Sequence, residues 1–339
     1  MNIAIIGGNG KYSMESSLSD SLKDKGHACQ VFDIYDNWVY KKASIKRYSV
    51  PADQFIRKSI EAYDKKSWLR LANGVEQMHP DLVICIDRRI HPAFVSALKS
   101  PNRRIIQVNP DSFFTLGAQQ VFASDYDAWF VKDPYMLRFM QDNMRVNTFL
   151  YREVSDIRLS PKPNEHKSVT EKRIDVDVMT YGTLYPYRTR ILRQVVDAGI
   201  DLKLYGTVPH RFFDRTLTHC YTGEFILGAR RAEVIYGAKI ALNTLHFAEV
   251  ESVNARFFQI NCSGGFQLCD YRPILKELLP VDPELVSYRN TDECIEKIKY
   301  YLEHPQERYE IAEKIYDYSI KHFTFEHLAD YLLNVVKKL

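Results

Sequence analysis

The 339-residue sequence lacks several features that would assign it to a specialised class of protein. Its six cysteines form no Cys-x-x-Cys pair, and no carboxylate cluster has metal-ligand spacing, so we expect neither a disulfide framework nor a metal site. No apolar run reaches the roughly 18 residues that span a membrane, which predicts no membrane span and leaves peripheral association open. The chain starts directly in a strand-like run, without a leader segment, which predicts a cytoplasmic location.

The sequence also lacks a large excess of charge of either sign. The net charge is only +3, so the chain is not an obvious binder of polyanions, and we expect no nucleic-acid partner. A content of 45% hydrophobic and 26% charged residues is typical of globular proteins. The length suits two domains of roughly 100–200 residues each. The sequence contains no internal repeats and no low-complexity tract.

Short apolar runs alternate with helical patterns along the whole chain. This alternation predicts an α/β fold with mostly parallel, doubly wound sheets. Residues 36–68 have weak periodicity and are expected to form an insertion. The Pro- and charge-rich residues 154–172 lose all periodicity and are interpreted as a linker or exposed loop. We therefore expect an N-terminal domain over residues 1–155 and a C-terminal domain over residues 173–322.

One stretch, residues 241–271, carries the strongest functional pattern. An apolar strand-like run leads to a polar loop; Ser252 is then placed to cap a helix, and Gly264-Gly265 to end it. Free N–H groups in the first turn of such a helix suit an anion such as a diphosphate. Glu251 precedes the helix and Gln259 lies inside it, where both can hydrogen-bond hydroxyl groups. The pattern predicts a phosphate-bearing ligand with hydroxyls.

This stretch resembles the signature of a known family. The matching residues are Ser252-Val253-Asn254-x-Arg256-x-Phe258-x-Ile260-x-x-Ser263-Gly264-Gly265-Phe266, followed by Asp270-Tyr271. They are similar to CgeB-like enzymes of the group-1 (family 4-like) glycosyltransferases, which have the GT-B fold. The resemblance covers residues 176–335 well and residues 1–150 only in outline. It implies two Rossmann-like domains facing an interdomain cleft, with a terminal helix, residues 323–339, that crosses back to the N-terminal domain.

The resemblance also implies an activity and site residues. The activity is transfer of a sugar from a nucleotide-sugar donor to an acceptor hydroxyl, with retention of configuration and without a metal or other cofactor. Glu251 is expected to be catalytic, holding and orienting the transferred sugar. Arg188, or Arg190 as the alternative, and the helix start at residues 252–254 (Ser252, Val253 and Asn254) are expected to bind the diphosphate. The second acid of the family pattern falls on neutral Gln259, which is expected to bind donor hydroxyls with altered preference or affinity. The acceptor, a glycan, protein or small molecule, is not specified.

The first half contains a weaker glycine pattern. Gly8-x-Gly10 follows the first strand, and Asp33 comes about 20 residues later, as in a dinucleotide-binding fingerprint, but Ser13 replaces the third glycine. In the glycosyltransferase interpretation, the turn formed by Gly8, Asn9 and Gly10 would lie near donor phosphate or acceptor.

Polar residues also follow two later strands of the first half. His91 is predicted to act as a proton shuttle or as a hydrogen-bond partner of the transferring sugar. Asp111 is predicted to be an acceptor ligand or base. Ligands of open α/β sheets bind at the carboxyl ends of strands, which is the reason for placing both residues at a site. The role of His91 is what the resemblance to the glycosyltransferases implies.

Two alternative functions stay open at this point. The glycine turn and Asp33 fit an NAD(P)-dependent oxidoreductase, although that interpretation explains neither Arg188 nor the pair of Glu251 and Gln259. A catalytically silent nucleotide- or carbohydrate-binding relative is the other, because Gln259 stands where the family has an acid.

Overall fold

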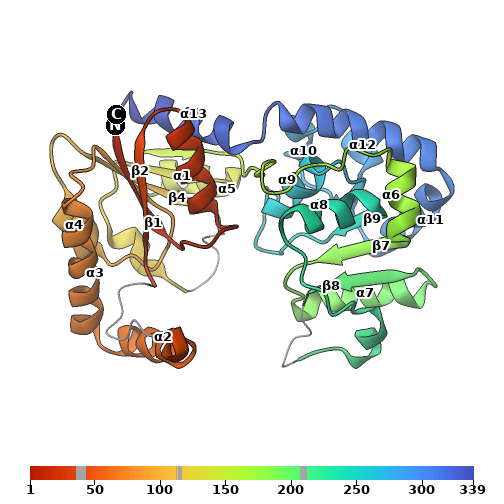
Figure 1. Ribbon diagram of the computed structural model, residues 1–339, viewed down its shortest axis with the longest axis horizontal. Coiled ribbons are helices and arrows are strands. Elements are labelled where there is room, and N and C mark those ends of the chain that lie inside the picture. Colours follow the sequence, from red (N-terminus) through yellow and green to blue (C-terminus); the bar gives the residue numbers. More distant parts are fainter. Residues whose placement is uncertain (36–42, 112, 114–116, 207–211) are drawn as a thin grey trace. The chain divides into compact units, whose positions relative to one another are not determined.

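The computed structural model describes residues 1–35, 43–111, 113, 117–206 and 212–339, with residues 43–49 described only in their backbone. The chain divides into two compact units (Figure 1). The N-terminal unit comprises Met1–Arg152 and Phe325–Leu339, and the C-terminal unit comprises Glu153–Thr324.

A six-stranded parallel sheet forms the centre of the N-terminal unit, with the strand order β2-β1-β3-β4-β5-β6. Its strands are β1 (Asn2–Gly7), β2 (Ala28–Asp33), β3 (Leu82–Cys85), β4 (Arg104–Asn109), β5 (Ala128–Val131) and β6 (Thr148–Leu150). The register places Ile5 between Val31 and Ile84. The central strands are apolar along their length because helices cover a parallel sheet on both faces.

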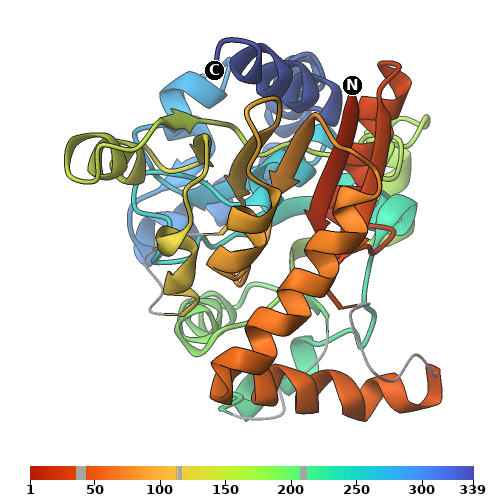
Figure 2. The same cartoon turned by 90° about the vertical axis from the view of Figure 1, so that its left-hand side faces the viewer.

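The helices of the N-terminal unit include the C-terminal segment of the chain. They are α1 (Met14–Asp24), α2 (Ala43–Ser59), α3 (Glu61–Glu76), α4 (Pro92–Leu98), the 3₁₀ helix η1 (Gln119–Ala123), α5 (Pro134–Asp142) and α13 (Phe325–Val336). Helix α13 packs beside α1, and the Tyr331 hydroxyl donates to the Leu150 carbonyl at 2.7 Å. Residues 43–68 of the expected insertion lie in helices α2 and α3 (Figure 2), while residues 36–42 lie outside the described part.

The C-terminal unit is built around a second parallel sheet, with the order β11-β10-β9-β7-β8. Its strands are β7 (Val176–Tyr181), β8 (Leu202–Tyr205), β9 (Ala238–Asn243), β10 (Gln267–Asp270) and β11 (Ser287–Tyr288). Its helices are α6 (Lys167–Ile174), α7 (Pro186–Asp197), η2 (Arg215–Cys220), α8 (Gly228–Gly237), α9 (Ala255–Cys262), α10 (Leu275–Leu278), η3 (Pro283–Leu285), α11 (Thr291–Glu303) and α12 (Pro305–Ile320).

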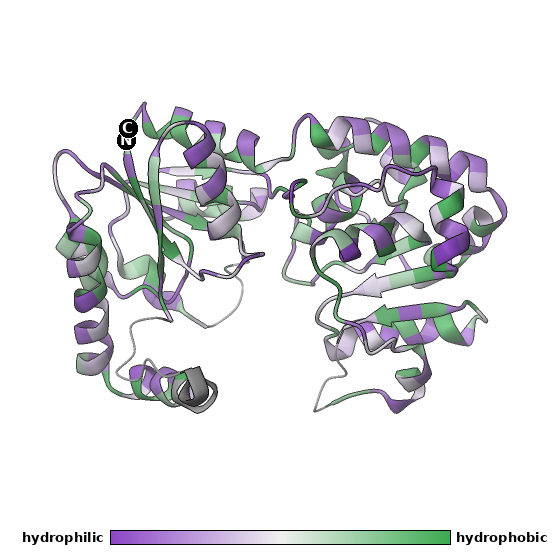
Figure 3. Cartoon of the chain, in the orientation of Figure 1, coloured by the Kyte–Doolittle hydropathy of each residue, from purple (hydrophilic) through white to green (hydrophobic). Residues whose placement is uncertain are grey.

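Each unit has its own hydrophobic core against its sheet. Hydrophobic residues concentrate along the strands, whereas hydrophobic and hydrophilic residues alternate along the helices (Figure 3). In the N-terminal unit, Trp68 and Phe94 meet edge to face at 5.8 Å within the core. In the C-terminal unit, Met179 and Ala241 pack with Ile260 of α9. This packing fixes α9 against the sheet.

The strand orders identify the ligand-binding end of each sheet. In the N-terminal unit, β2 lies on one side of β1 and β3 on the other. In the C-terminal unit, β8 and β9 flank β7 in the same way. The chain therefore adds its second strand on one side of the first strand and its third strand on the other side, which makes a topological switch point. Open α/β sheets bind ligands at the carboxyl ends of the strands beside such a point.

A buried lysine anchors α6, so the expectation of a linker or loop was wrong for residues 167–172. The Lys167 amine donates to the carbonyl of Tyr236, in the last turn of α8, at 2.7 Å and to that of Gly264, just beyond α9, at 3.1 Å. Burial lowers the pKa of Lys167 from its ordinary 10.5 to about 7, although Glu171 opposes this shift. Helix α6 is held by one buried amine and has no regularly spaced apolar face. The sequence pattern therefore did not indicate a helix.

We expect the stability of the C-terminal unit to rise with pH because of Lys167. Between about pH 7 and 10.5 the unfolded chain holds a proton on this amine that the folded unit has released, so unfolding becomes less favourable as pH increases. From pH 7 to 9 this gain amounts to about 2 kcal/mol. Urea unfolding followed by circular dichroism should show the gain in the wild type and lose it in Lys167→Met. Lys172→Met, on the exposed side of α6, is the control and should keep the wild-type slope.

Candidate functional site

Two arginines from different helices meet beyond the carboxyl end of β7. Arg188 lies in the first turn of α7 and donates to the Thr183 carbonyl at 2.8 Å. Arg256 lies in the first turn of α9 and donates to the Tyr181 carbonyl at 2.7 Å and to the Thr244 carbonyl at 3.1 Å. Gly182, at φ +90°, makes the turn that separates β7 from α7. Both guanidinium groups are therefore held by backbone carbonyls at the switch point.

The two guanidinium groups form an uncompensated positive site. Arg188 is 5% exposed, and its Nε atom is buried without a hydrogen-bond partner. Burial, and then the charge of Arg188, lower the pKa of Arg256 to about 10. Within the described residues, neither arginine has a carboxylate within ion-pair distance. Buried cations normally have a counter-ion, so this arrangement favours an anion with several oxygens.

Helix α9 is positioned by buried side-chain amides. Asn254, not Ser252, caps the helix and accepts from the Phe257 N–H. Asn243 and Asn254 exchange two hydrogen bonds of 3.1 Å, and Asn243 also donates to Gln267 at 2.8 Å. The expected cap at Ser252 was wrong because Asn254 has a partner on β9 that holds its side chain in the capping position.

Residues 244–253 form the loop between β9 and α9. The Ser252 hydroxyl donates to Glu249, and both side chains are buried. Asp270, at the end of β10, accepts from the Leu245 N–H at 2.6 Å, and burial raises the pKa of its carboxyl. Val253 is buried as well. The side chains of Ser252 and Val253 therefore support the loop, and any contact of theirs with a ligand would come through the backbone.

Glu251 and Gln259 occupy different positions relative to this loop. Glu251 is partly exposed and precedes the helix cap by three residues. Gln259 is on α9, and its Oε1 atom accepts from the Tyr181 hydroxyl at 3.0 Å. The carbonyl oxygen of the Gln259 amide is thus engaged with β7, and its NH₂ group is the end available for a ligand oxygen.

The glycine turn of the N-terminal unit is occupied by a side chain from α1, the helix that follows the turn. Glu15, in the first turn of α1, accepts from the Gly8 N–H at 2.8 Å. A Cβ atom on Gly7 would lie 2.1 Å from the Glu15 carboxyl, so a glycine is required there for the carboxyl to fit. The Ser13 hydroxyl donates to the Gly8 carbonyl. A carboxyl therefore lies where a dinucleotide fingerprint would place a pyrophosphate, and this disfavours the oxidoreductase alternative.

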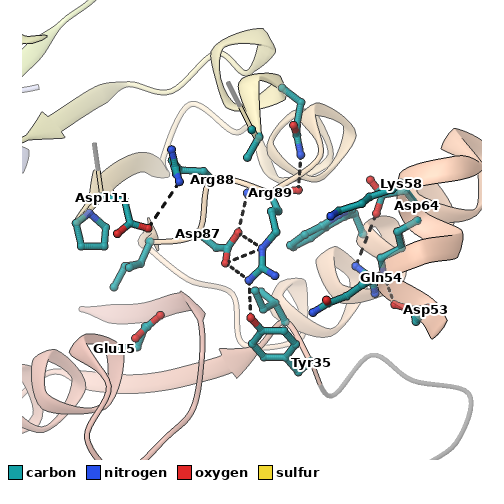
Figure 4. Close-up of a pocket in the computed structure, with 18 residues that line it drawn as sticks. Glu15, Tyr35, Asp53, Gln54, Lys58, Asp64, Asp87, Arg88, Arg89 and Asp111 are labelled. Atoms are coloured by element: carbon teal, nitrogen blue, oxygen red, sulfur yellow. Dashed lines mark hydrogen bonds and ion pairs between the residues drawn. The ribbon is translucent and has the colours of Figure 1, made fainter. Parts of the chain in front are cut away.

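A cavity of about 650 Å³ lies beside this turn, at the carboxyl ends of the first four strands (Figure 4). Its lining comes from the first turn of α1, the ends of β2 and β3, helices α2 and α3, and the segment after β4. Figure 4 shows Asp87, Arg88 and Arg89 in its centre, with Glu15 and Tyr35 on one side. The N-terminal unit thus offers a polar pocket at its switch point.

The other two predicted residues of the N-terminal unit lie in different surroundings. Asp111 lines the cavity, and its carboxylate is 3.8 Å from Arg88. His91 is the N-cap of α4, where its Nδ1 atom accepts from the Ala93 N–H at 3.0 Å, and it does not line this cavity. Asn9 contacts Ser16 at 3.4 Å, and Gly10 accepts from the Ser13 N–H.

Sequence reasoning missed Arg256 and Glu15 as site residues. Arg256 stands inside the 252–266 pattern, two residues after the helix cap, so its place in the first turn was a usable signal. Glu15 carried no such signal, because a helix of this type often has an acid in its first turn for the dipole alone.

Two kinds of feature are absent from the described residues, namely membrane-spanning helices and clusters of metal-binding side chains. None of their helices is long and apolar enough to cross a membrane. Nor do they contain a group of three or more His, Cys, Asp or Glu side chains that could hold a metal ion.

Comparison with known proteins confirms the resemblance seen in the sequence. Residues 188–334 match a family model described as glycosyl transferase-like. The chain is 22% identical to spore protein CgeB of Bacillus subtilis (strain 168), over 59% of this chain and 71% of that protein. The matched family region includes both Arg188 and Arg256.

Solved glycosyltransferase structures share the fold across both units. Anabaena HepE, solved with UDP and glucose, aligns with a TM-score of 0.69 at 13% identity, covering 100% of each chain. A glycosyltransferase from Rickettsia africae ESF-5 aligns with a TM-score of 0.68 at 10% identity, covering 99% of this chain and 98% of that one. Sucrose-phosphate synthase from Thermosynechococcus elongatus gives a TM-score of 0.66 at 11% identity, with the same coverage. The predicted GT-B fold of two Rossmann-like α/β domains is confirmed.

Proposed function

We propose that this chain is a GT-B glycosyltransferase that moves a sugar from a nucleotide-sugar donor to an acceptor hydroxyl. The observation that carries the proposal is the pair of uncompensated guanidinium groups of buried Arg188 and partly buried Arg256 at the switch point of the C-terminal unit. The match of residues 188–334 to the glycosyl transferase-like family supports it.

In this proposal the two arginines bind the diphosphate of the donor. Each guanidinium group donates to phosphate oxygens, and the N–H groups before the first hydrogen-bonded turn of α9 add a partial positive charge. As the bond from the anomeric carbon to the diphosphate breaks, negative charge grows on the leaving phosphate oxygen. Donors already fixed in place stabilise that charge without reorganisation.

The remaining donor contacts follow from the loop before α9. Glu251 accepts hydrogen bonds from hydroxyls of the transferred sugar and so orients the anomeric carbon. Gln259 holds a donor hydroxyl through its NH₂ group, since its oxygen is engaged by Tyr181. Because this charge stabilisation comes from arginines, we propose a reaction that needs no metal ion. Retention of the anomeric configuration is proposed because the sequence resembles the group-1 (family 4-like) glycosyltransferases.

The test is a binding screen followed by a turnover assay. Thermal shift against UDP, GDP, ADP, CMP, dTDP, NAD and NADP should give a selective increase in melting temperature with one nucleoside diphosphate. UDP is the first to test because HepE was solved with it. Turnover of the matching nucleotide sugar should survive EDTA, and proton NMR of the product should show the donor's anomeric configuration.

Each part of the proposal fails on a different result. A shift by the dinucleotides alone would contradict a glycosyltransferase. Nucleotide binding without hydrolysis or transfer, across donor sugars, would favour the silent relative. Loss of turnover in EDTA that a divalent ion restores would contradict metal independence, and an inverted product would contradict retention.

A further inference from the structure

The cavity of the N-terminal unit differs in its charges from the arginine site of the C-terminal unit. Its arginines are neutralised by neighbouring acids, whereas Arg188 and Arg256 are not. Arg89 donates to both oxygens of Asp87 and, at 2.6 Å, to the Tyr35 hydroxyl. This bonding raises the pKa of Arg89 further above its ordinary value and fixes the guanidinium plane. A phosphate would have to compete with an acid that is already in place.

Two other arginines of the lining follow the same pattern. Arg57 pairs with Asp53 at 2.5 Å and lies 3.7 Å from Asp64, while Arg88 faces Asp111 at 3.8 Å. Lys58 has no ion-pair partner within the described part of the chain, and Glu15 contributes a further acid. The lining acids therefore offset the lining cations, and the cavity presents no excess positive charge for an anionic ligand.

Alternating carboxylates and guanidinium groups suit a ligand with many hydroxyls. A hydroxyl donates one hydrogen bond and accepts up to two, so it can bridge an acid and an arginine that already pair with each other. Neutral sugars have such hydroxyls around a ring. About 650 Å³ is room for one or two sugar rings, since ligand pockets run from roughly 300 to 1,000 Å³.

Glu15 is placed to contact such a ligand at the side of the cavity formed by the glycine turn. Its Oε1 atom accepts from Gly8, which fixes the carboxyl, and its side chain lines the cavity. Only 8% of Glu15 is exposed, and burial raises the pKa of its carboxyl, with Asp87 adding to the shift. A buried acid with one oxygen fixed by the backbone is a directed hydrogen-bond acceptor.

We propose that this cavity is the acceptor site, that it takes a neutral, polyhydroxylated saccharide group, and that Glu15 accepts a hydrogen bond from a hydroxyl of that group. The inference rests on the proposed glycosyl transfer and adds the chemical class of the acceptor. It also gives the glycine turn a different role: Gly7 makes room for Glu15, the Gly8 N–H holds its carboxyl, and Glu15 contacts the acceptor.

The experiment is saturation-transfer NMR on the full-length protein, with and without saturating UDP. The neutral probes are methyl α-D-glucopyranoside and methyl β-D-galactopyranoside, and the anionic probes are glucose 6-phosphate and glucuronic acid. We expect the neutral glycosides to bind and the anionic sugars to bind no better. Failure of the wild type to bind either neutral glycoside while UDP binds overturns the inference. Failure to bind any nucleoside diphosphate instead contradicts the proposed function, so the two failures are distinguishable.

Two variants locate the binding. Glu15→Gln keeps size and the bond to Gly8 but replaces a carboxylate oxygen by an NH₂ group, so glycoside binding should fall about tenfold while UDP affinity stays unchanged. Glu76→Gln, which alters a carboxylate paired with Arg103 outside the cavity, should leave glycoside binding intact. Equal losses in both variants would overturn a role for Glu15.

Lys58→Glu tests the charge of the ligand and does not depend on the folding of the Glu15 variant. The Lys58 side chain is exposed and lines the cavity, so reversal of its charge should leave the core unchanged. Binding of a neutral glycoside should change by less than about twofold, whereas an anionic ligand would be repelled. Preferential binding of glucose 6-phosphate or glucuronic acid that Lys58→Glu abolishes would show an anionic acceptor and overturn the inference.

Discussion

Replacing either Arg188 or Arg256 by Met should lower the affinity for a nucleoside diphosphate about 100-fold. Each side chain would lose one or more hydrogen bonds to a charged group, worth roughly 1.5–3 kcal/mol apiece, at a site with little access to water. Because the two guanidinium groups repel each other and a shared anion relieves that repulsion, the double variant should lose less than the sum of the single losses.

Isothermal titration calorimetry with UDP, or with whichever nucleotide the screen selects, measures these losses. Arg190→Met is the matched control, since Arg190 lies on the same helix and is exposed. Circular dichroism must show an intact fold, because Arg256 also donates to two carbonyls. An unchanged dissociation constant in Arg188→Met, or an equal loss in Arg190→Met, would remove Arg188 from the site.

Replacing Arg308 by Met should destabilise the C-terminal unit by about 3–5 kcal/mol. Arg308 is 1% exposed and donates to Glu171 at 2.8 Å and to the Tyr301 carbonyl at 2.7 Å. Its loss leaves a buried carboxylate without its cation. Glu171→Gln in the same chain should restore part of the stability, since the uncompensated charge is removed while the bond from the Tyr309 hydroxyl can remain.

Two probes can assign the effect to one unit. Residues 153–324 contain no tryptophan, and Trp68 and Trp129 are buried in the N-terminal unit. Tryptophan fluorescence therefore follows the N-terminal unit during urea unfolding, while far-ultraviolet circular dichroism follows both units. The dichroism transition should move to lower urea in Arg308→Met. Arg230→Met, which breaks exposed pairs with Glu224 and Glu233, should cost less than about 1 kcal/mol. A similar cost in both variants would mean that the buried pair contributes no more than a surface one.

The proposed division of work between the units follows from their charges. The C-terminal unit has two cations with no acid beside them, which suits the diphosphate of a donor. The N-terminal unit has cations and acids in pairs, which suits the hydroxyls of an acceptor. The two sheets thus offer the same topological position for a ligand. The side chains that follow the strands determine the charge of the ligand proposed for each position.

The sequence predicted the features that depend on local patterns. Apolar runs such as residues 82–85 become buried strands because both faces of a parallel sheet are covered. Gly264, with φ +72°, follows the end of α9 as expected, since this backbone conformation is strained for other residues. The pattern over residues 252–271 pointed to the family, and the comparisons confirm that resemblance.

Other features depended on side chains that no local pattern connects. Asn254 replaced Ser252 as the helix cap because Asn243, on a neighbouring strand, holds its amide. Helix α6 forms around Lys167, whose partners are carbonyls far along the chain. His91 follows a strand, as predicted for a site residue, yet its ring nitrogen caps α4.

The sequence by itself determined the two-sheet α/β architecture, the glycine turns and the resemblance of the C-terminal half to the glycosyl transferase-like family. Only the tertiary structure decided which polar and charged groups meet: Arg256 with Arg188, Glu15 with Gly8, and each arginine of the N-terminal cavity with an acid. The physical reason is that periodicity reports whether a residue is buried, which is a local property. The meeting of charges depends on strand order and loop course, which bring together groups distant in the chain.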